Sequence, residues 1–415
     1  MPFAALGLSP AIVRALQIEG FSSPSAIQTE AIPTILAGRD VVGSAQTGSG
    51  KTLAYGLPLL EKISTLASGR ARRIHALVLV PTRELAVQAG TTLRELAGHL
   101  QQEIRITVVF GGVSINPQLL ALRGGAHIVV ATPGRLLDLI AHNAVRLDTV
   151  QTLVLDEADR LLELGFQDEL RSILECLPKA RQSLFFSATF PAAVVELADA
   201  LLLDPVRIAV ALEPQTESDI EQHAVLVDAG RRTQLLRHLI NTNHWKRVLV
   251  FVATKHAAEI VADKLRKVRI HAEPFHGELS QGKRAQVLAD FKASRLTAIV
   301  ATDLAARGID IHQLPVVVNY DLPRSSIDYT HRIGRTGRAG EHGVAFSFVT
   351  PAQEPHFRLI QKRNALSLPL DTVEGFEAAE VIPPLHNGGG IKGKRPSKKD
   401  KLRAQNSNSD LKISL

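Results

Sequence analysis

Short apolar runs rich in β-branched residues recur along the chain, and each is followed by a segment with helical patterning. Near-continuous Val, Leu and Ile runs are typical of strands buried on both faces, as in parallel sheets covered by helices. The runs form two groups, at residues 40–42, 76–80, 105–110, 127–131, 152–155 and 183–187, and at 225–227, 247–252, 270–275, 297–301, 316–319 and 345–349. The sequence therefore predicts an α/β fold built in two parts.

A polar stretch containing a proline separates the two groups of runs. At 415 residues the chain is too long for one ordinary core, so two domains are expected. We expect an N-terminal α/β domain, a linker, a C-terminal α/β domain and a basic, disordered tail, at residues 1–212, 213–219, 220–370 and 371–415. The two halves look like one architecture used twice.

The composition excludes several classes of protein. A single cysteine, Cys176, excludes an internal disulfide framework and suits a reducing compartment. The first residues lack the basic segment of a signal peptide, and no apolar run approaches the length of a membrane span. We therefore expect a soluble, cytoplasmic protein with no membrane partner.

The net charge of +7 is concentrated in the tail. Residues 387–415 carry eight Lys or Arg against two Asp, a net charge of +6. Such a tail is either a solubilising segment or a flexible arm that attracts nucleic acid by counterion release.

Residues 45–52 read AQTGSGKT and follow the first apolar run. Backbone N–H groups of a Gly-rich turn that opens a helix can wrap phosphate oxygens. Lys51 is placed to reach the β- and γ-phosphates, and the Thr52 hydroxyl can ligate Mg²⁺. The alternative is a Gly-rich turn that only connects a strand to a helix. The predicted phosphate-loop residues are Ala45, Gln46, Thr47, Gly48, Ser49, Gly50, Lys51 and Thr52, with Ala45 where the general pattern has Gly.

An acidic tetrapeptide, Asp156-Glu157-Ala158-Asp159, follows the apolar run at 152–155. Asp156 is suited to holding Mg²⁺ through water, and Glu157 is a candidate to orient and deprotonate an attacking water. The alternative is a solvated acidic face. Because parallel sheets bind ligands beyond the carboxyl ends of their strands, this placement favours a nucleoside triphosphate site.

Further short segments, in this order, make the chain resemble the DEAD-box ATP-dependent RNA helicases, of the bacterial RhlE-like subgroup, over about residues 3–350. One departure is Ser25-Ala26, where the family usually has Thr-Pro. The segments are GFSSPSAIQ (20–28) preceded by Phe3, PTRELA (81–86), GG (111–112), TPGR (132–135), SAT (187–189), QGKR (281–284), residues 301–310 and HRIGRTGR (331–338).

The resemblance implies two tandem RecA-like domains, with the Q motif within residues 1–29. The Gln28 amide offers a donor and an acceptor that suit an adenine edge, and Phe21 offers an aromatic face for stacking. The alternative for these two residues is a helix-capping Gln and a core Phe. The resemblance favours ATP as the nucleotide.

Three arginines, Arg332, Arg335 and Arg338, recur every third residue, so a helical turn would set them on nearly one face. Surface cations are ordinarily solvated, which is the alternative here. The resemblance assigns Arg335 and Arg338 to the γ-phosphate as arginine fingers, supplied only when the domains close. It also implies that Asp310 contacts the ribose.

The resemblance implies RNA as the ligand that closes the domains. The residues predicted to contact RNA combine hydroxyls, glycines and cations, which bind phosphates and sugars without reading the base sequence. We expect Ser187, Thr189, Asp159, Asp303 and His331 to couple the ATP and RNA sites, with hydrogen bonds linking Asp159 to the Ser187 motif and to His331. The predicted RNA contacts are Thr82, Arg83, Gly111, Gly112, Thr132, Gly134, Arg135, Arg284 and Thr302.

The resulting hypothesis is an ATP-dependent RNA helicase that opens short duplexes locally or remodels RNA–protein complexes. Ribosomal or RNA-decay proteins are possible partners at the level of the family. The alternatives are an ATP-switched RNA clamp with little strand separation, a DNA helicase, and an ATPase with no nucleic-acid role.

Overall fold

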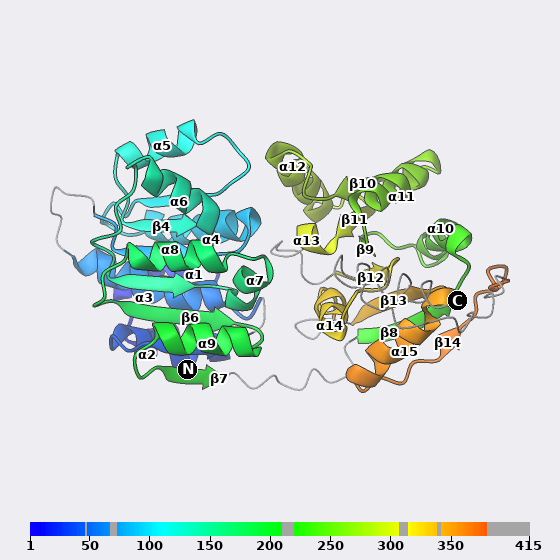
Figure 1. The fold of residues 1–415 in the computed structure, drawn as a ribbon, viewed down its shortest axis with the longest axis horizontal. Helices are drawn as coiled ribbons and strands as arrows, with labels where there is room; N and C mark the ends of the chain where they lie inside the picture. Colours follow the sequence, from blue (N-terminus) through cyan, green and yellow to red (C-terminus); the bar gives the residue numbers. More distant parts are fainter. Residues whose placement is uncertain (46–47, 67–72, 210–219, 307–313, 338–341, 380–415) are drawn as a thin grey trace, which may run out of the picture.

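The computed structural model describes residues 1–45, 48–66, 73–209, 220–306, 314–337 and 342–379. They form two lobes that lie side by side, each with a parallel sheet between helices (Figure 1). The first lobe holds residues up to 209 and the second those from 220 to 379. The predicted α/β fold with two RecA-like parts is confirmed.

Each sheet contains seven strands, all parallel. The first sheet has the order β3-β4-β2-β5-β6-β1-β7 and the second β10-β11-β9-β12-β13-β8-β14. The strands of the first lobe are β1 Val41–Ser44, β2 Ala76–Leu79, β3 Ile106–Val109, β4 Ile128–Ala131, β5 Thr152–Leu155, β6 Gln182–Ser187 and β7 Val206–Ala209. Those of the second are β8 Ile220–Leu226, β9 Val248–Val252, β10 Ala272–Phe275, β11 Ala298–Thr302, β12 Val316–Asn319, β13 Gly343–Val349 and β14 Leu370–Asp371.

Helices cover both faces of each sheet. In the first lobe they are η1 Phe3–Leu6, α1 Pro10–Ile18, α2 Ala26–Leu36, α3 Lys51–Thr65, α4 Arg83–Gly98, α5 Asn116–Arg123, α6 Pro133–Ala141, α7 Ala158–Glu163, α8 Gln167–Glu175 and α9 Ala192–Leu201. In the second they are η3 Ala229–Arg231, α10 Arg232–Thr242, α11 Lys255–Lys267, α12 Gln281–Lys292, α13 Asp303–Ala306, α14 Ser326–Ile333, η4 Pro351–Gln353 and α15 Glu354–Arg363. No helix in this part of the chain is long and apolar enough to cross a membrane.

Successive residues of the central strands belong to different hydrophobic clusters. In β2, Val78 packs with helices α1 to α4, whereas Leu77 and Leu79 pack with the cluster that includes α6, α8 and α9. In β9, Val250 and Leu249 are divided in the same way between two clusters. Both faces of each sheet are therefore buried, which explains the near-continuous apolar runs in the sequence.

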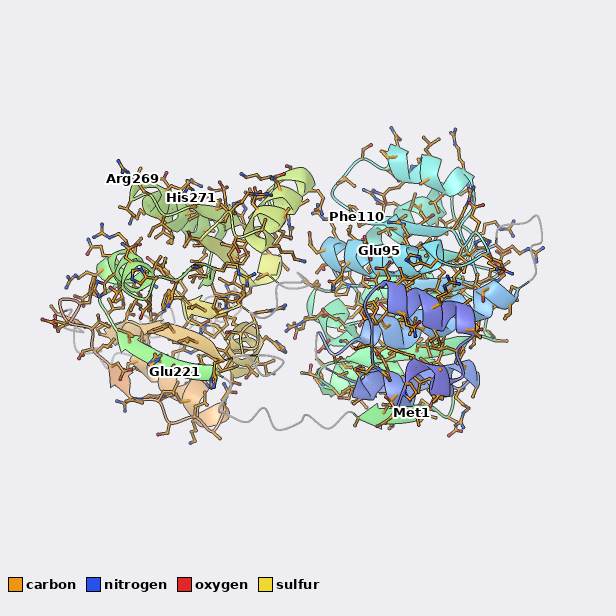
Figure 2. All side chains as sticks on the ribbon, turned by 180° about the vertical axis from the view of Figure 1, so that it is seen from behind. Met1, Glu95, Phe110, Glu221, Arg269 and His271 are labelled. Carbon is orange, nitrogen blue, oxygen red and sulfur yellow. The ribbon has the colours of Figure 1, made fainter. Side chains whose placement is uncertain are left out.

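The carboxyl ends of the strands in each lobe face the other lobe. Seen from behind with all side chains (Figure 2), Phe110, just past β3, lies on the edge of the first lobe nearest the second. Arg269 and His271, just before β10, lie on the outer side of the second lobe. Since parallel sheets bind ligands beyond the carboxyl ends of their strands, the sites of both lobes are directed toward the space between them.

Two strands that the sequence did not predict complete the sheets. In β7 only Ile208 is buried, and β14 is two residues long. Both are edge strands, which explains why neither shows a continuous apolar run. Residues after 371 continue along the second lobe, where the Ala379 N–H donates to Asp228. The prediction of a disordered tail from 371 is therefore wrong for residues 371–379, where Val373 and Phe376 pack against the core of the second lobe. The rest of the predicted tail, 380–415, lies outside the described residues.

Asp40, at the start of β1, ties three strands of the first sheet together. Its Oδ1 accepts the N–H of Ser183, within β6, at 2.8 Å, and its Oδ2 accepts the N–H of Leu203, before β7, at 2.9 Å. Its backbone carbonyl accepts the Val206 N–H at 2.9 Å. Asp40 is 8% exposed and Ser183 2%, so the bond between them has little access to water.

We expect Asp40→Ala to lower the free energy of unfolding of the first lobe by about 2–3 kcal/mol, because two N–H groups lose their acceptor. Urea unfolding followed by circular dichroism measures the loss. The matched control is Asp199→Ala, which removes an exposed 3.2 Å ion pair with Arg207. The control should change stability by less than about 0.5 kcal/mol, and equal losses in both variants would contradict a bridging role for Asp40.

Candidate nucleotide and RNA sites

The phosphate loop joins β1 to α3 at the edge of the sheet that faces the second lobe. The Ala45 N–H donates to the Ser187 carbonyl at 3.1 Å, which extends the β1–β6 pairing into the loop. Gly48 and Gly50 have φ of +84° and +91°, a conformation that favours glycine, and Lys51 then begins α3. Gln46 and Thr47 lie outside the described residues. The described part of the loop has the strand–turn–helix setting that phosphate binding requires.

The start of α2 holds the loop in place. Gln28 Nε2 donates to the Gly50 carbonyl at 3.0 Å, and Ser25 Oγ donates to the Ser49 carbonyl at 2.8 Å. A Cβ on Gly50 would lie 2.3 Å from Gln28 Nε2, so a larger residue there would displace the Gln28 amide from the loop as well as strain the backbone at φ +91°. The residue that departs from the family pattern, Ser25, thus supports the phosphate loop directly.

Gln28 also caps its own helix. Its Oε1 accepts the Ser25 N–H at 2.9 Å, which completes a capping box at the start of α2. The Gln28 amide oxygen can accept one further hydrogen bond, and its nitrogen can donate one more. The predicted adenine contact is therefore compatible with these two bonds, and it stays a prediction. Phe21 is 37% exposed, which leaves its ring accessible for the predicted stacking.

Lys51 and Asp156 face each other at the carboxyl ends of β1 and β5. Lys51 Nζ lies 3.6 Å from Asp156 Oδ1, and the two side chains are 5% and 8% exposed. Within the described residues, Lys51 Nζ has no hydrogen-bond partner. A buried ammonium without a full set of acceptors suits an anionic ligand, so the residues present fit a triphosphate.

Tyr55, one turn into α3, orients Asp156. Its buried hydroxyl donates to Asp156 Oδ2 at 3.1 Å. Burial, followed by the charge on Asp156, raises the pKa of Tyr55 well above its ordinary value, and a hydrogen bond with Thr52 opposes this shift. The phenol therefore remains a donor, and it fixes the carboxylate that sequence reasoning had assigned to magnesium. The sequence carried no signal for this role of Tyr55.

Glu157 adopts a left-handed backbone conformation between β5 and α7. Its φ and ψ are 52° and 53°, and the residue is 6% exposed. The Glu157 N–H donates to Asp156 Oδ1 at 2.9 Å. Non-glycine residues rarely hold this conformation, and those that do cluster at functional sites.

Asp159 joins the acidic motif to the Ser187-Ala188-Thr189 motif. Asp159 Oδ2 accepts the Thr189 hydroxyl at 2.8 Å and the Thr189 N–H at 3.0 Å. Ser187 Oγ accepts the Asp159 N–H at 3.3 Å and donates to the Thr189 carbonyl at 2.7 Å. The structure thus brings together the first-lobe residues that were predicted to couple the two sites.

His331, from the second lobe, meets the first lobe through Arg160. Its Nδ1 is hydrogen-bonded to Arg160 Nη2, and no hydrogen bond joins its ring to Asp159 among the described contacts. Burial and the charge of Arg160 lower the pKa of His331 to about 4, against the effect of Asp159 and Asp328. His331 lies in a motif that is visible in the sequence, whereas no sequence signal marks Arg160.

Arg332 and Arg335 do not share one helical face. For these two arginines the expectation is wrong, because α14 ends at Ile333, before Arg335. Arg332 is 3% exposed and binds Asp303 with Nε and Nη2 at 2.6 and 2.8 Å. Arg335 is 8% exposed and lines a small pocket with His331. Arg338, like Asp310, lies outside the described residues.

A cavity of about 590 Å³ lies between the lobes and gathers most of the predicted RNA contacts. Thr302 is not among its lining residues, but it ends β11 directly before α13, whose Leu304 and Ala305 do line it. Glu84, Asp138 and Phe166 also line it and were not predicted. The predicted residues in its wall are Thr82, Arg83, Gly111, Gly112, Thr132, Gly134, Arg135 and Arg284.

The charges in this cavity are partly paired. Arg284 Nη2 lies 3.0 Å from Glu84 Oε1 across the two lobes, with side chains 6% and 9% exposed, and its guanidinium stacks over the Phe275 ring. Arg135 Nη2 donates to the Val113 carbonyl at 2.7 Å. Burial lowers the pKa of Arg284, and Glu84 opposes that shift. Contacts within the protein therefore orient the guanidinium groups of Arg135 and Arg284.

Known proteins share these motifs and this architecture. Residues 25–197 match the family described as DEAD/DEAH box helicase, and residues 231–340 match the helicase conserved C-terminal domain. The chain is 40% identical over 360 residues to the DEAD-box ATP-dependent RNA helicase CshA of Bacillus cereus, which covers 87% of this chain and 67% of that protein. It is 38% identical over 379 residues to the ATP-dependent RNA helicase CshA of Limosilactobacillus reuteri, which covers 91% of this chain and 75% of that protein.

Structures of related proteins superpose on both lobes. Dbp5 of S. cerevisiae bound to RNA and ADP BeF3 matches with a TM-score of 0.77 at 30% identity, over 90% of this chain and 95% of that one. Mss116p bound to ssRNA and AMP-PNP matches with a TM-score of 0.79 at 26% identity, over 90% and 79%. A DEAD box protein from Methanococcus jannaschii matches with a TM-score of 0.51 at 36% identity, over 90% and 99%. By its motifs, its matches over both lobes and its fold, this chain belongs to the DEAD-box family of ATP-dependent RNA helicases.

Proposed function

We propose that this chain hydrolyses ATP when RNA closes its two lobes, and that each closure opens a short RNA duplex locally or remodels an RNA–protein complex. The observation that carries the proposal is the position of Asp159. It follows the acidic residues of the nucleotide site and bonds Thr189 in its own lobe, and its neighbour Arg160 reaches the second lobe. A change in the position of the second lobe would thereby reach the residues that handle ATP.

The proposed ATP site has distinct roles for its residues. The phosphate loop and Lys51 bind the triphosphate, while Phe21 and Gln28 select adenine. Thr52 and Asp156 would hold Mg²⁺, largely through water, and the metal would neutralise phosphate charge. Glu157 orients and deprotonates the attacking water. Arg335 and Arg338 are proposed to reach the γ-phosphate from the second lobe, and Asp310 the ribose.

RNA is proposed to lie in the cavity between the lobes. Its wall offers glycine backbone at Gly112 and Gly134, hydroxyls and guanidinium groups, which suit phosphates and sugars. A backbone grip of this kind positions a strand without selecting its sequence. The bend that closure imposes on the gripped strand would separate it from its partner.

Several finer predictions remain proposals. They are the RhlE-like subgroup, a cytoplasmic location, ribosomal or RNA-decay protein partners, and domain limits at 1–212, 213–219, 220–370 and 371–415. The relatives named above are CshA proteins, and they support the family without selecting the subgroup. The pairing of β14 with β8 supports a second domain that extends at least to residue 371.

The function is tested by an ATPase titration with and without RNA, beside the Glu157→Gln variant. We expect RNA to stimulate hydrolysis in the native chain, and Glu157→Gln to lower kcat by about 10²–10⁴-fold, because the general base is lost. ATP and RNA binding should persist in the variant. Hydrolysis that ignores RNA in the native chain would contradict the proposal, and failure to displace a short duplex strand would favour the ATP-switched clamp.

Tyr55→Phe tests how Asp156 is oriented. The variant removes the hydrogen bond to Asp156 Oδ2, so the Mg²⁺ concentration for half-maximal ATPase should rise by about 10-fold. The matched control is Tyr329→Phe, which deletes another buried hydroxyl, bonded to Gln222 in the second lobe. The same Mg²⁺ dependence in both variants would show that Tyr55 does not act through Asp156.

The double variant Ser187→Ala with Thr189→Ala tests coupling. It removes the hydroxyl bonds to Asp159 and leaves Lys51 and Glu157 intact. RNA-stimulated ATPase should persist within a few-fold, whereas strand displacement of a short duplex should fall by at least about 10-fold. The control, Ser64→Ala with Thr65→Ala, removes two hydroxyls that bond only to carbonyls of α3. Equal loss of both activities in the first variant would count against a coupling role.

A further inference from the structure

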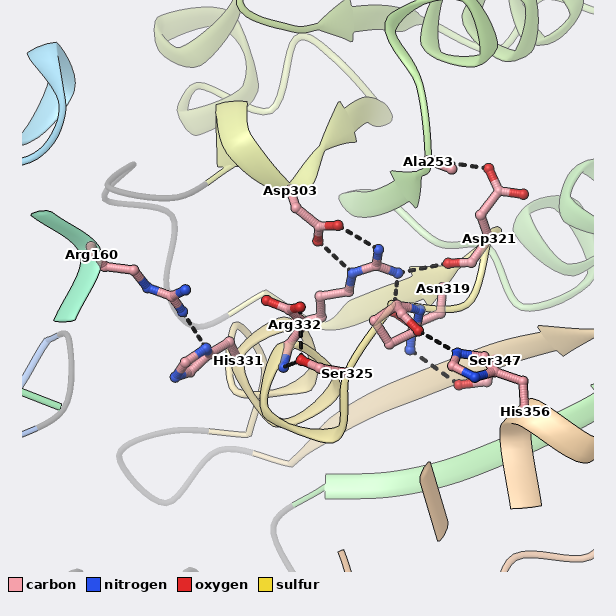
Figure 3. A network of polar contacts seen from close by, with 12 residues as sticks. Arg160, Ala253, Asp303, Asn319, Asp321, Ser325, His331, Arg332, Ser347 and His356 are labelled. Atoms are coloured by element: carbon pink, nitrogen blue, oxygen red, sulfur yellow. Dashed lines mark hydrogen bonds and ion pairs between the residues drawn. The ribbon is translucent and has the colours of Figure 1, made fainter. Parts of the chain in front are cut away.

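Arg160 is the residue of the first lobe that contacts the ring of His331 (Figure 3). It lies on α7, directly after the acidic tetrapeptide, and its side chain is 11% exposed. Its Nη1 pairs with Glu163 Oε2 at 2.5 Å, one turn later on the same helix. Its Nη2 crosses to the second lobe and reaches His331 Nδ1. One guanidinium thus holds a carboxylate of its own helix and an imidazole of the other lobe.

The chemistry of this contact fixes the state of the imidazole. Arginine has no acceptor and remains charged, so Arg160 is the donor and His331 Nδ1 must carry a lone pair. The ring is then neutral, and its proton lies on Nε2. A protonated His331 would present an N–H to the guanidinium and would lose the bond. The contact therefore requires one tautomer of a neutral histidine.

One neighbouring residue on each side of the contact leads into its own lobe. Beside Arg160, Asp159 binds Thr189 of the coupling motif. Beside His331, Arg332 forms a two-bond pair with Asp303 at the start of α13 and also donates to Asn319 Oδ1 at 3.1 Å (Figure 3). Among the described contacts, the Arg160–His331 bond links these two networks, which belong to different lobes.

We propose that Arg160 is a positioning residue that holds His331 neutral in its Nε2–H form and transmits the state of the Ser187 motif to the second lobe. Arg335, four residues after His331, is thereby placed for closure. The inference rests on the proposed coupling of ATP hydrolysis to RNA, and it adds a residue to which the sequence analysis assigned no role.

The groups around His331 set the pH behaviour of the contact. Asp159 and Arg160 face it from α7, Asp328 from its own helix α14, and Arg335 from the segment after that helix. Asp303 of α13 shares the small pocket beside it. Burial is the main cause that lowers the pKa of His331 to about 4, and the Arg160 charge adds to it. Loss of that charge raises the pKa of His331, whereas the two aspartates continue to favour the protonated ring.

Kinetics of Arg160→Ala in the full chain test the proposal. The kcat of RNA-stimulated ATPase should fall by about 10-fold while the KM for ATP stays within about two-fold, because the phosphate site is untouched. Arg160→Lys, which keeps the charge and a donor, should restore part of kcat. The matched control is Arg171→Ala, an exposed arginine on α8 with a similar i,i+3 ion pair, and it should match the native chain.

A second measurement separates positioning from a merely structural role. The imidazole of His331, assigned by NMR with His331→Gln, should titrate near 4 in the native chain and at a higher pH in Arg160→Ala. The variant should also lose RNA-stimulated activity as the pH falls from about 8 to 5, where the native chain does not. In a double-mutant cycle, Arg160→Ala should add little to the loss caused by His331→Ala.

Additive losses in that cycle, or a His331 titration that Arg160→Ala does not move, would overturn the inference. RNA stimulation of the native chain is measured in the same assay. Its absence would defeat the proposed function itself, so the two failures are distinguishable.

Discussion

The burial of both faces of each parallel sheet is the constraint on which the rest of the molecule depends. A strand such as β2, with every residue buried, leaves no position for a polar side chain along its length. Functional residues must then stand at strand ends, and parallel strands bring all their carboxyl ends to one edge. Asp156 follows β5 and Ser187 ends β6, and the phosphate loop after the adjacent strand β1 brings Lys51 to the same edge of the sheet.

The same constraint explains how far the sequence could predict the structure. Continuous apolar runs revealed the buried strands, because a strand that is buried on both faces carries apolar side chains at nearly every position. The edge strands β7 and β14 were not predicted, since an edge strand does not need a continuous apolar run. Among site residues, those in local motifs were found. Tyr55 and Arg160 were missed because their partners, Asp156 and His331, are 101 and 171 positions away.

The arrangement of the two lobes is closer to some relatives than to others. The TM-score is 0.77 and 0.79 for the two RNA- and nucleotide-bound proteins, but 0.51 for the Methanococcus jannaschii protein, although the last is the most identical of the three at 36%. Because each comparison spans about nine-tenths of the chain, the difference indicates a different placement of one lobe against the other. The ion pair between Glu84 and Arg284 belongs to the placement seen here. RNA phosphates in this cavity would compete with Glu84 for the same guanidinium, so the acidic residue offsets part of the attraction while keeping Arg284 oriented.

Arg332 and Arg335 are three positions apart in the sequence but have different surroundings in the fold. Arg332 is enclosed by Asp303, the Asn319 side chain, the Asp321 carbonyl and the ring of Phe251, which together compensate the desolvation of its charge. Because the Arg332 guanidinium has so many partners in the second lobe, breaking these bonds to bind a phosphate would cost a large free energy. Arg335 lies beyond the end of α14, where the chain is no longer helical. The end of α14 therefore separates a cation that stabilises the second lobe from the arginine that lines the small pocket beside His331, and the His331 ring itself is hydrogen-bonded to Arg160 of the first lobe.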